Sequence, residues 1–201
     1  MNSSKIQLSA EEMQLVTSSG WILTKHRVIE KVYLLLGELS GRMQEYLEQN
    51  KAVLPAKLLQ LSPKIAKGEQ YKQLPYVVLD YPRVFSKEDV FAVRCFFWWG
   101  NYFSITLHLK GIFQQAYGHK IITALADRHL PGYYISFEGN EFSFNLAGKN
   151  YAPLSNGLLE EYKTGDPCFL KISYQVPLAD WPVAGEKLLE VFKRYLNLVI
   201  D

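Results

Sequence analysis

His108 is the side chain in this sequence best suited to acid–base chemistry. It lies in an apolar, strand-like run and shares one face of that run with Thr106 and other polar residues. A histidine titrates near neutral pH and acts as a general base when it can reach a proton of the substrate. Asp80 and Arg94 lie in neighbouring strand-like runs and are its candidate partners. One hypothesis is therefore an enzyme with His108 as general base in a cleft near Asp80 and Arg94.

Asp80 and two of the other histidines also have purely structural interpretations. Asp80 precedes Tyr81-Pro82-Arg83, where an aspartate often holds a turn through its own side chain. His26 lies among basic residues of an expected helix, so we expect it to face solvent. His129 adjoins a Pro-Gly break, where a histidine suits the end of the preceding helix.

The motifs of the common enzyme classes are missing from the sequence. It has no phosphate-binding loop, no dinucleotide fingerprint, no HExxH, no CxxC and no GxSxG. A metal site needs three or more converging ligands, which the helical stripe of His119, Thr123 and Asp127 does not supply. Glu138 and Glu141 are expected to form a solvent-screened surface pair across a turn. The sequence therefore predicts no cofactor, no metal and no motif-defined catalytic residue.

Aromatic rings are unusually dense in residues 90–110, which read VFAVRCFFWWGNYFSITLHLK. Two strand-like runs meet there at Gly100-Asn101. A loop with an odd number of residues, centred on Gly100, pairs Phe97 with Phe103 and gives one wholly apolar face. A two-residue loop would mix polar and apolar side chains on both faces. Because a one-residue slip moves every side chain across the sheet, we predict the odd-numbered loop.

This register leaves a second face with more rings than a monomer normally exposes, so something must cover it. One cover is the chain itself, either its N-terminal helix or the loop of residues 150–166. The other is a ligand or partner, for which Arg94 and His108 would be polar anchors among the rings. The ligand-binding residues of that hypothesis are Arg94, Phe96, Trp98, Tyr102 and His108.

Helices are predicted before and after this aromatic hairpin. Ser9 and Glu12 form a capping box for a short helix that ends near Gly20. After it, apolar residues recur every seven positions, which predicts one long helix that lies across the sheet or pairs with a second copy. Those residues are Ile22, Ile29, Leu36 and Met43. Helical spacing also predicts a middle helix over 112–127 and a C-terminal helix after Asp180.

Further strands are predicted from alternation of polar and apolar residues. Residues 76–81 form a short strand, and 133–146 form a second hairpin with a two-residue loop at Gly139-Asn140. A last strand covers 168–176, with Lys171 and Ser173 on the side that faces solvent. One-sided alternation of this kind is typical of antiparallel sheets.

Composition excludes some classes of partner. The 22 basic and 20 acidic side chains give a formal net charge of +2, which indicates neither a nucleic-acid nor a membrane partner. The N-terminus is polar, and no stretch approaches the ~20 apolar residues of a membrane span. Cys95 and Cys168 are expected to be reduced and buried. We therefore expect a soluble, cytoplasmic protein.

The expected fold is α+β, with a predominantly antiparallel sheet of about five or six strands built from hairpins. A long N-terminal helix, a middle helix and a C-terminal helix pack on it. Residues 1–201 are expected to form a single domain, with a helical part over 1–62 and the sheet and later helices over 70–201. The function expected is a non-enzymatic binding or interaction module that uses the aromatic sheet face. Its ligand is a small molecule or a protein, and a homodimer is a further candidate.

Overall fold

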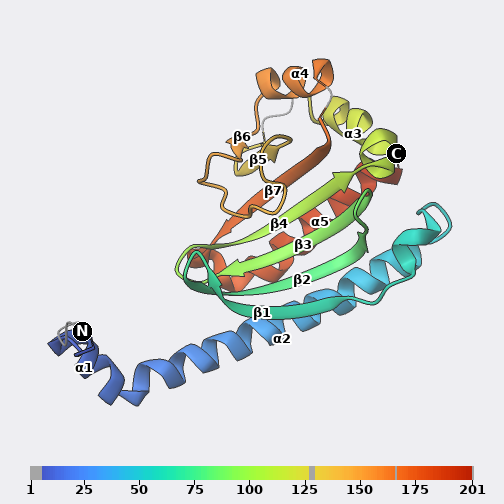
Figure 1. The fold of residues 1–201 in the computed structure, drawn as a ribbon. Helices are drawn as coiled ribbons and strands as arrows, with labels where there is room; N and C mark the ends of the chain where they lie inside the picture. The colour runs from blue at the N-terminus through green and yellow to red at the C-terminus, as the bar shows by residue number, and fades with distance from the viewer. Residues whose placement is uncertain (1–5, 127–129, 166, 201) are drawn as a thin grey trace.

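The computed structural model describes residues 6–126, 130–165 and 167–200 (Figure 1). Four strands follow one another without an intervening helix, and helices come before and after this run. In chain order the elements are α1 (Ala10–Thr17), α2 (Ser19–Gln49), a 3-10 helix (Ala56–Leu59), β1 (Lys64–Tyr71), β2 (Leu74–Phe85), β3 (Val90–Trp98), β4 (Tyr102–Lys110), α3 (Ile112–Leu125), β5 (Tyr133–Ser136), β6 (Ala152–Pro153), α4 (Asn156–Thr164), β7 (Phe169–Pro177), a second 3-10 helix (Leu178–Val183) and α5 (Ala184–Ile200).

The strands form one antiparallel sheet in the order β1-β2-β3-β4-β7-β5-β6. The predicted α+β class is confirmed, and the sheet of seven strands is slightly larger than the five or six expected. The difference comes from β1 and from the two-residue strand β6, which are short or irregular. Strands β3, β4 and β7 lie in the middle of this order, so they have partners on both sides.

The predicted register of the aromatic hairpin is confirmed. Phe97 of β3 lies opposite Phe103 of β4, and Cys95 lies opposite Ile105. Three residues connect the strands, and Gly100 among them has a φ of +72°, which a residue with a side chain rarely adopts. The sheet therefore has a first face that is wholly apolar on this hairpin and a second face that carries Arg94 and His108.

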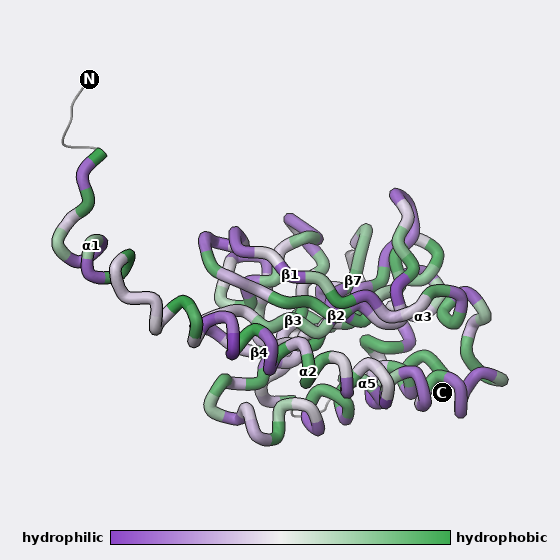
Figure 2. The backbone as a smooth tube through the Cα atoms, turned by 90° about the horizontal axis from the view of Figure 1, so that it is seen from below, coloured by the Kyte–Doolittle hydropathy of each residue, from purple (hydrophilic) through white to green (hydrophobic). Residues whose placement is uncertain are grey.

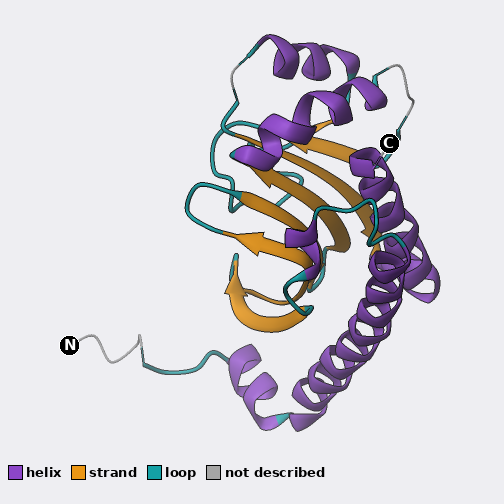
Figure 3. Cartoon of the chain, turned by 90° about the vertical axis from the view of Figure 1, so that its right-hand side faces the viewer, coloured by secondary structure: helices purple, strands orange, loops and turns teal. Residues whose placement is uncertain are grey.

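The first face of the sheet packs against helices. Leu36 and Met43 of α2 and Phe192 of α5 are buried in one core cluster with Phe97 and Phe103. Figure 3 shows α2 running alongside the curved sheet. Helix α3 adds buried residues to the same cluster. The heptad spacing read in the sequence thus marks the buried side of α2 from Ile29 onward.

Residues 137–151 do not form the second strand of the predicted hairpin. Strand β5 ends at Ser136 and pairs with β7 on one side and β6 on the other, so that prediction is wrong. The chain instead crosses the second face of the sheet as an irregular segment before it returns to the edge at β6. We call residues 137–151 the covering segment. Burial of a ring-rich second face outweighs the pairing of one more hairpin.

The N-terminal end of α2 and all of α1 project from the rest of the molecule (Figures 1 and 2). Helix α1 begins with the predicted capping box of Ser9 and Glu12 and has no buried residue. Residues 6–28, which we call the arm, also contain no buried residue. None of the helices among the described residues has the length and apolarity to cross a membrane.

Candidate functional site

Cross-strand pairing brings the polar residues of the second face into two adjacent rows. The first row runs from Asp80 of β2 through Arg94 of β3 to Thr106 of β4 and Ser173 of β7. The Arg94 guanidinium donates two hydrogen bonds to the Asp80 carboxylate, at 2.6 and 2.7 Å. The Thr106 and Ser173 hydroxyls are hydrogen-bonded at 2.7 Å. This row is thus paired within itself.

The second row runs from His108 of β4 through Lys171 of β7 to Ser136 of β5. Lys171 is fully buried, and its ammonium donates to the carbonyl oxygens of Glu141 at 3.0 Å and Ser143 at 2.5 Å. Both acceptors belong to the covering segment. Because a buried cation needs hydrogen-bond partners, Lys171 ties that segment to the sheet.

His108 and Glu141 face each other without a formed hydrogen bond. The distance from His108 Nε2 to Glu141 Oε2 is 3.4 Å, and both atoms are buried with no hydrogen-bond partner among the described residues. The other carboxylate oxygen of Glu141 accepts a hydrogen bond from Lys110 at 2.8 Å. The two side chains are therefore near enough for an ion pair, but their geometry does not form a hydrogen bond.

Burial sets the protonation of this row. Desolvation lowers the pKa of His108 to about 3, and the positive charges of Lys171, Arg94 and Lys110 act in the same direction. Desolvation, together with Arg94, also lowers the pKa of Lys171 to about 7, while Glu141 opposes that shift. His108 is consequently neutral at physiological pH.

These values bear on the enzyme hypothesis. His108 lies on the same face as Arg94, one row away from it, whereas Asp80 lies on β2, two strands from His108. Both oxygens of Asp80 are bound by Arg94. An effective general base also titrates near the working pH and reaches its substrate, whereas His108 is buried and has a strongly lowered pKa. The geometry does not favour His108 in that role.

Tyrosine hydroxyls hold the covering segment over the aromatic end of the second face. The Tyr102 hydroxyl donates to the Phe144 carbonyl at 3.1 Å and accepts from the Leu146 amide at 2.8 Å. The Tyr71 hydroxyl accepts from the Phe144 amide at 2.8 Å. The Phe144 ring stacks on Phe96 with 5.6 Å between centroids and 28° between planes. The segment is thus fixed by backbone hydrogen bonds as well as by ring contacts.

The five residues predicted to bind a ligand share one face, but the chain itself lies over them. Phe96, Trp98 and Tyr102 are 2%, 6% and 6% exposed, and His108 is 6% exposed. The Arg94 guanidinium lies 4.7 Å from the Phe144 ring centroid. The cover is the covering segment, and not the N-terminal helix, which packs on the first face. Tyr151, at the start of the predicted loop cover, contributes to it.

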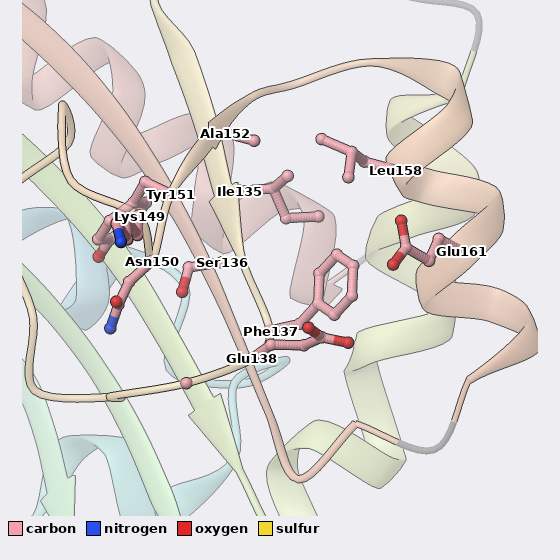
Figure 4. Close-up of a pocket in the computed structure, with 11 residues that line it drawn as sticks. Ile135, Ser136, Phe137, Glu138, Lys149, Asn150, Tyr151, Ala152, Leu158 and Glu161 are labelled. Carbon is pink, nitrogen blue, oxygen red and sulfur yellow. The ribbon is translucent and has the colours of Figure 1, made fainter.

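A pocket of about 250 Å³ opens where the covering segment leaves the sheet and rejoins it (Figure 4). Its walls come from β5, β6, both ends of the covering segment and α4. They include Ile135, Ser136, Phe137, Glu138, Lys149, Asn150, Tyr151, Leu158 and Glu161. We call it the edge pocket. A second hollow of about 380 Å³ shares Phe137, Glu138, Gly139 and Glu161 with it. Its lining includes Cys168, which is exposed, so the expectation that Cys168 is buried is wrong, whereas Cys95 is buried as expected.

Ser136 is the notable residue of the edge pocket. It is 4% exposed, and its hydroxyl is buried without a hydrogen-bond partner among the described residues. A buried hydroxyl of this kind is uncommon, because leaving it unpaired costs about 1–3 kcal/mol. Figure 4 shows it between Asn150 and Phe137, with Glu138 next to the Phe137 ring and Glu161 on the far side of that ring. One wall residue of the pocket therefore has a hydroxyl that makes no hydrogen bond within the described residues.

Sequence reasoning expected Lys171 to face solvent and did not single out Ser136. Both lie on the second face, as their alternation indicates, but the covering segment buries them. The only signal was that each pairs in register with another polar residue of a central strand, which cannot be read before the strand order is known.

The remaining candidates do not assemble into a site. His26 and His119 are exposed, and His129 and Asp127 lie outside the described residues. Glu138 and Glu141 do not face each other across a hairpin turn, because that hairpin is not formed. In the described part of the chain, no three histidine, cysteine or acidic side chains converge on a metal site.

Comparison with known proteins found no matching family model, no matching curated protein and no matching solved structure.

Proposed function

We propose that this protein is a non-enzymatic binding module and that the edge pocket holds its small-molecule ligand. The observation that carries the proposal is the Ser136 hydroxyl, which is buried beside the pocket without a hydrogen-bond partner among the described residues. A ligand that hydrogen-bonds to it would remove the cost of leaving it unpaired.

The lining of the pocket defines the class of ligand. Its volume of about 250 Å³ lies just below the range of drug-sized sites, which fits a molecule of amino-acid size. Glu138 and Glu161 outnumber Lys149 among its charged residues. The ligand is therefore a small polar amine, whose ammonium group meets the carboxylates while another polar group meets Ser136.

The residues of the aromatic face act indirectly in this function, because they hold the covering segment in place. Phe96 and Tyr102 hold the covering segment, and Arg94 and His108 lie under it. Since both ends of that segment line the pocket, these residues and Trp98 are positioning residues that fix its walls. This assignment revises the expected direct contact between the rings and a ligand.

Titration calorimetry with a set of L-amino acids and short diamines tests the proposal. At least one of them should bind the wild-type protein and be recovered chemically unchanged. Ser136→Val and Glu161→Gln should each weaken its binding about tenfold or more, because each removes one polar contact. Glu160→Gln, on the outer side of the same helix, is the matched control and should have no effect.

Two results would overturn this function. One is that none of these amines binds. The other is that an amine binds equally well to the wild type, Ser136→Val and Glu161→Gln. Chemical conversion of a bound amine would instead favour the enzyme hypothesis.

Self-association is a second candidate function, and the projecting arm favours it. Over residues 6–28 the arm exposes large apolar side chains and buries none. Large exposed apolar surfaces on a protein often mark sites of interaction with other molecules.

We place the protein in the cytoplasm, because the unpaired cysteines Cys95 and Cys168 fit a reducing compartment.

A further inference from the structure

A groove lies along α2 where the arm meets the body of the molecule. It has a volume of about 670 Å³ and is formed by α2 and β1, with Lys25, His26, Ile29, Glu30, Tyr33, Leu34, Lys67 and Glu69 as its lining. Leu34 is 74% exposed at its rim. The apolar floor of this α2 groove is thus open to a partner.

Helix α1 has the complementary surface. Met13, Leu15 and Val16 are exposed on it, and Val16 is 68% exposed. Its charged residues are Glu11 and Glu12, and residues 10–17 contain no lysine or arginine. An amphipathic helix with such a surface binds in an apolar groove of another protein surface.

The two surfaces match in length, and one orientation of α1 also suits the charges of the groove. The lining carries both signs of charge, and Lys25 is paired with Glu69, which leaves Lys67 beside the Tyr33 ring as its other cation and Glu30 as its other acid. An α1 helix bound with Glu11 and Glu12 toward Lys67 would place opposite charges together. Eight helical residues span about 12 Å. The part of α2 that lines the groove, residues 25–34, spans about 15 Å. One α1 helix therefore fits along one groove.

Helix α1 does not occupy the groove of its own chain. No residue of α1 lines it. Instead, the Trp21 indole nitrogen donates to the Leu15 carbonyl at 3.1 Å, which holds α1 against the first turn of α2. The apolar side chains of α1 are thus exposed and in a position to reach a second molecule, whereas the arm meets the body at its base through Val28 and Lys25.

We propose that two copies of this chain exchange arms, so that α1 of each copy binds in the α2 groove of the other. This inference rests on the self-association proposed above and adds the surfaces that make it. The exchange is reciprocal and gives a closed two-fold dimer. A standard stable interface buries ~1,600 Å² in total, and the exchange would bury two arms and two grooves toward it.

Sedimentation velocity of the full chain over a range of concentrations is the first test. The wild type should form a dimer, and Leu15→Asp/Val16→Asp should raise its dissociation constant about tenfold or more, because two apolar contacts per arm are lost. Both residues are exposed, so the fold should be unaffected, which circular dichroism checks. Val53→Asp/Val183→Asp changes two equally exposed valines outside the arm and should dimerise normally.

Disulfide trapping between mixed variants is the second test. In a Cys168→Ser background, chains with Val16→Cys are mixed with chains carrying Leu34→Cys and oxidised. A covalent dimer should form in the mixture and in neither variant alone. When the second chain carries Val53→Cys instead of Leu34→Cys, no covalent dimer should form.

The outcomes separate the two proposals. A protein that stays monomeric at every concentration overturns both self-association and arm exchange. A dimer that survives Leu15→Asp/Val16→Asp, or that gives no Val16–Leu34 disulfide, overturns arm exchange alone and leaves self-association through another surface.

Discussion

Lys171 and His108 are ionisable side chains buried under a segment that the sequence does not place near them. The Lys171 ammonium donates to two carbonyl oxygens and lies 4.2 Å from the Phe144 ring centroid, and the charges of Arg94 and Glu141 act on it in opposite directions. These contacts offset only part of the free-energy cost of burying the ammonium charge. The stability of the protein should therefore depend on pH through these two residues.

Replacing Lys171 should remove part of the pH dependence of the free energy of unfolding. The pKa of Lys171 is about 7 in the folded protein and has an ordinary value of 10.5, so between these values the unfolded chain binds the extra proton. The free energy of unfolding should therefore rise with pH from about 7 to 10, by on the order of 3 kcal/mol. Urea denaturation should show that rise in the wild type and not in Lys171→Met.

Lys57→Met, at an exposed position, is the control and should keep the rise. Above about pH 10 the trend should reverse, because burial raises the pKa of Tyr102 to about 12 and the folded protein then retains a proton that the unfolded chain loses. An identical slope in the wild type and Lys171→Met between pH 7 and 10 would contradict the assignment.

At the scale of elements, the covering segment is an irregular loop that is held like a strand. Its backbone is bound by Tyr102 and Tyr71 from the sheet rather than by a neighbouring strand. Hydrogen bonds from side chains therefore hold this segment on the sheet, whereas backbone hydrogen bonds to neighbouring strands hold β5. The walls of the edge pocket depend on them.

Tyr102→Phe should loosen the covering segment without unfolding the sheet. It removes a hydroxyl that bonds to both Phe144 and Leu146, at a cost of about 1–3 kcal/mol. Hydrogen exchange should show faster exchange of the amides near residues 144–146. Tyr117→Phe, in the helix-covered core, should leave those amides unchanged. If the exchange in Tyr102→Phe equals that of the wild type, the hydroxyl does not hold the segment.

At the scale of the whole molecule, α2 has two roles along its length. From Ile29 onward its apolar side packs on the sheet, whereas its first turns and α1 form an arm that touches little of the body. The sheet is covered on its first face by helices and on its second face by the covering segment. The arm is left as the projecting apolar surface.

Two leucines on α2 should respond differently to truncation. Leu36 is buried against the sheet, and Leu36→Ala should lower the free energy of unfolding by about 2–5 kcal/mol because it leaves a cavity. Leu34 is exposed in the α2 groove, so Leu34→Ala should change stability by about 0.5 kcal/mol or less in dilute protein. Thermal and urea unfolding measure both. A large loss for Leu34→Ala would show that the groove is filled by its own chain.

The sequence by itself determined those features that depend on local periodicity. The heptad spacing from Ile22 located the long helix, and alternation in residues 90–110 allowed one register with a clean apolar face. Both signals are strong because a shift of one residue would expose the core side chains to water.

Only the tertiary structure decided the path of residues 137–151 and the site that it creates. Their alternation suits a hairpin, but burying the second face was more favourable than pairing another strand. Lys171 meets the Glu141 carbonyl across a sequence separation of 30 residues, and Ser136 is buried only because the segment crosses over it. Contacts of that kind depend on which strands are neighbours, and no local pattern in the chain specifies that order.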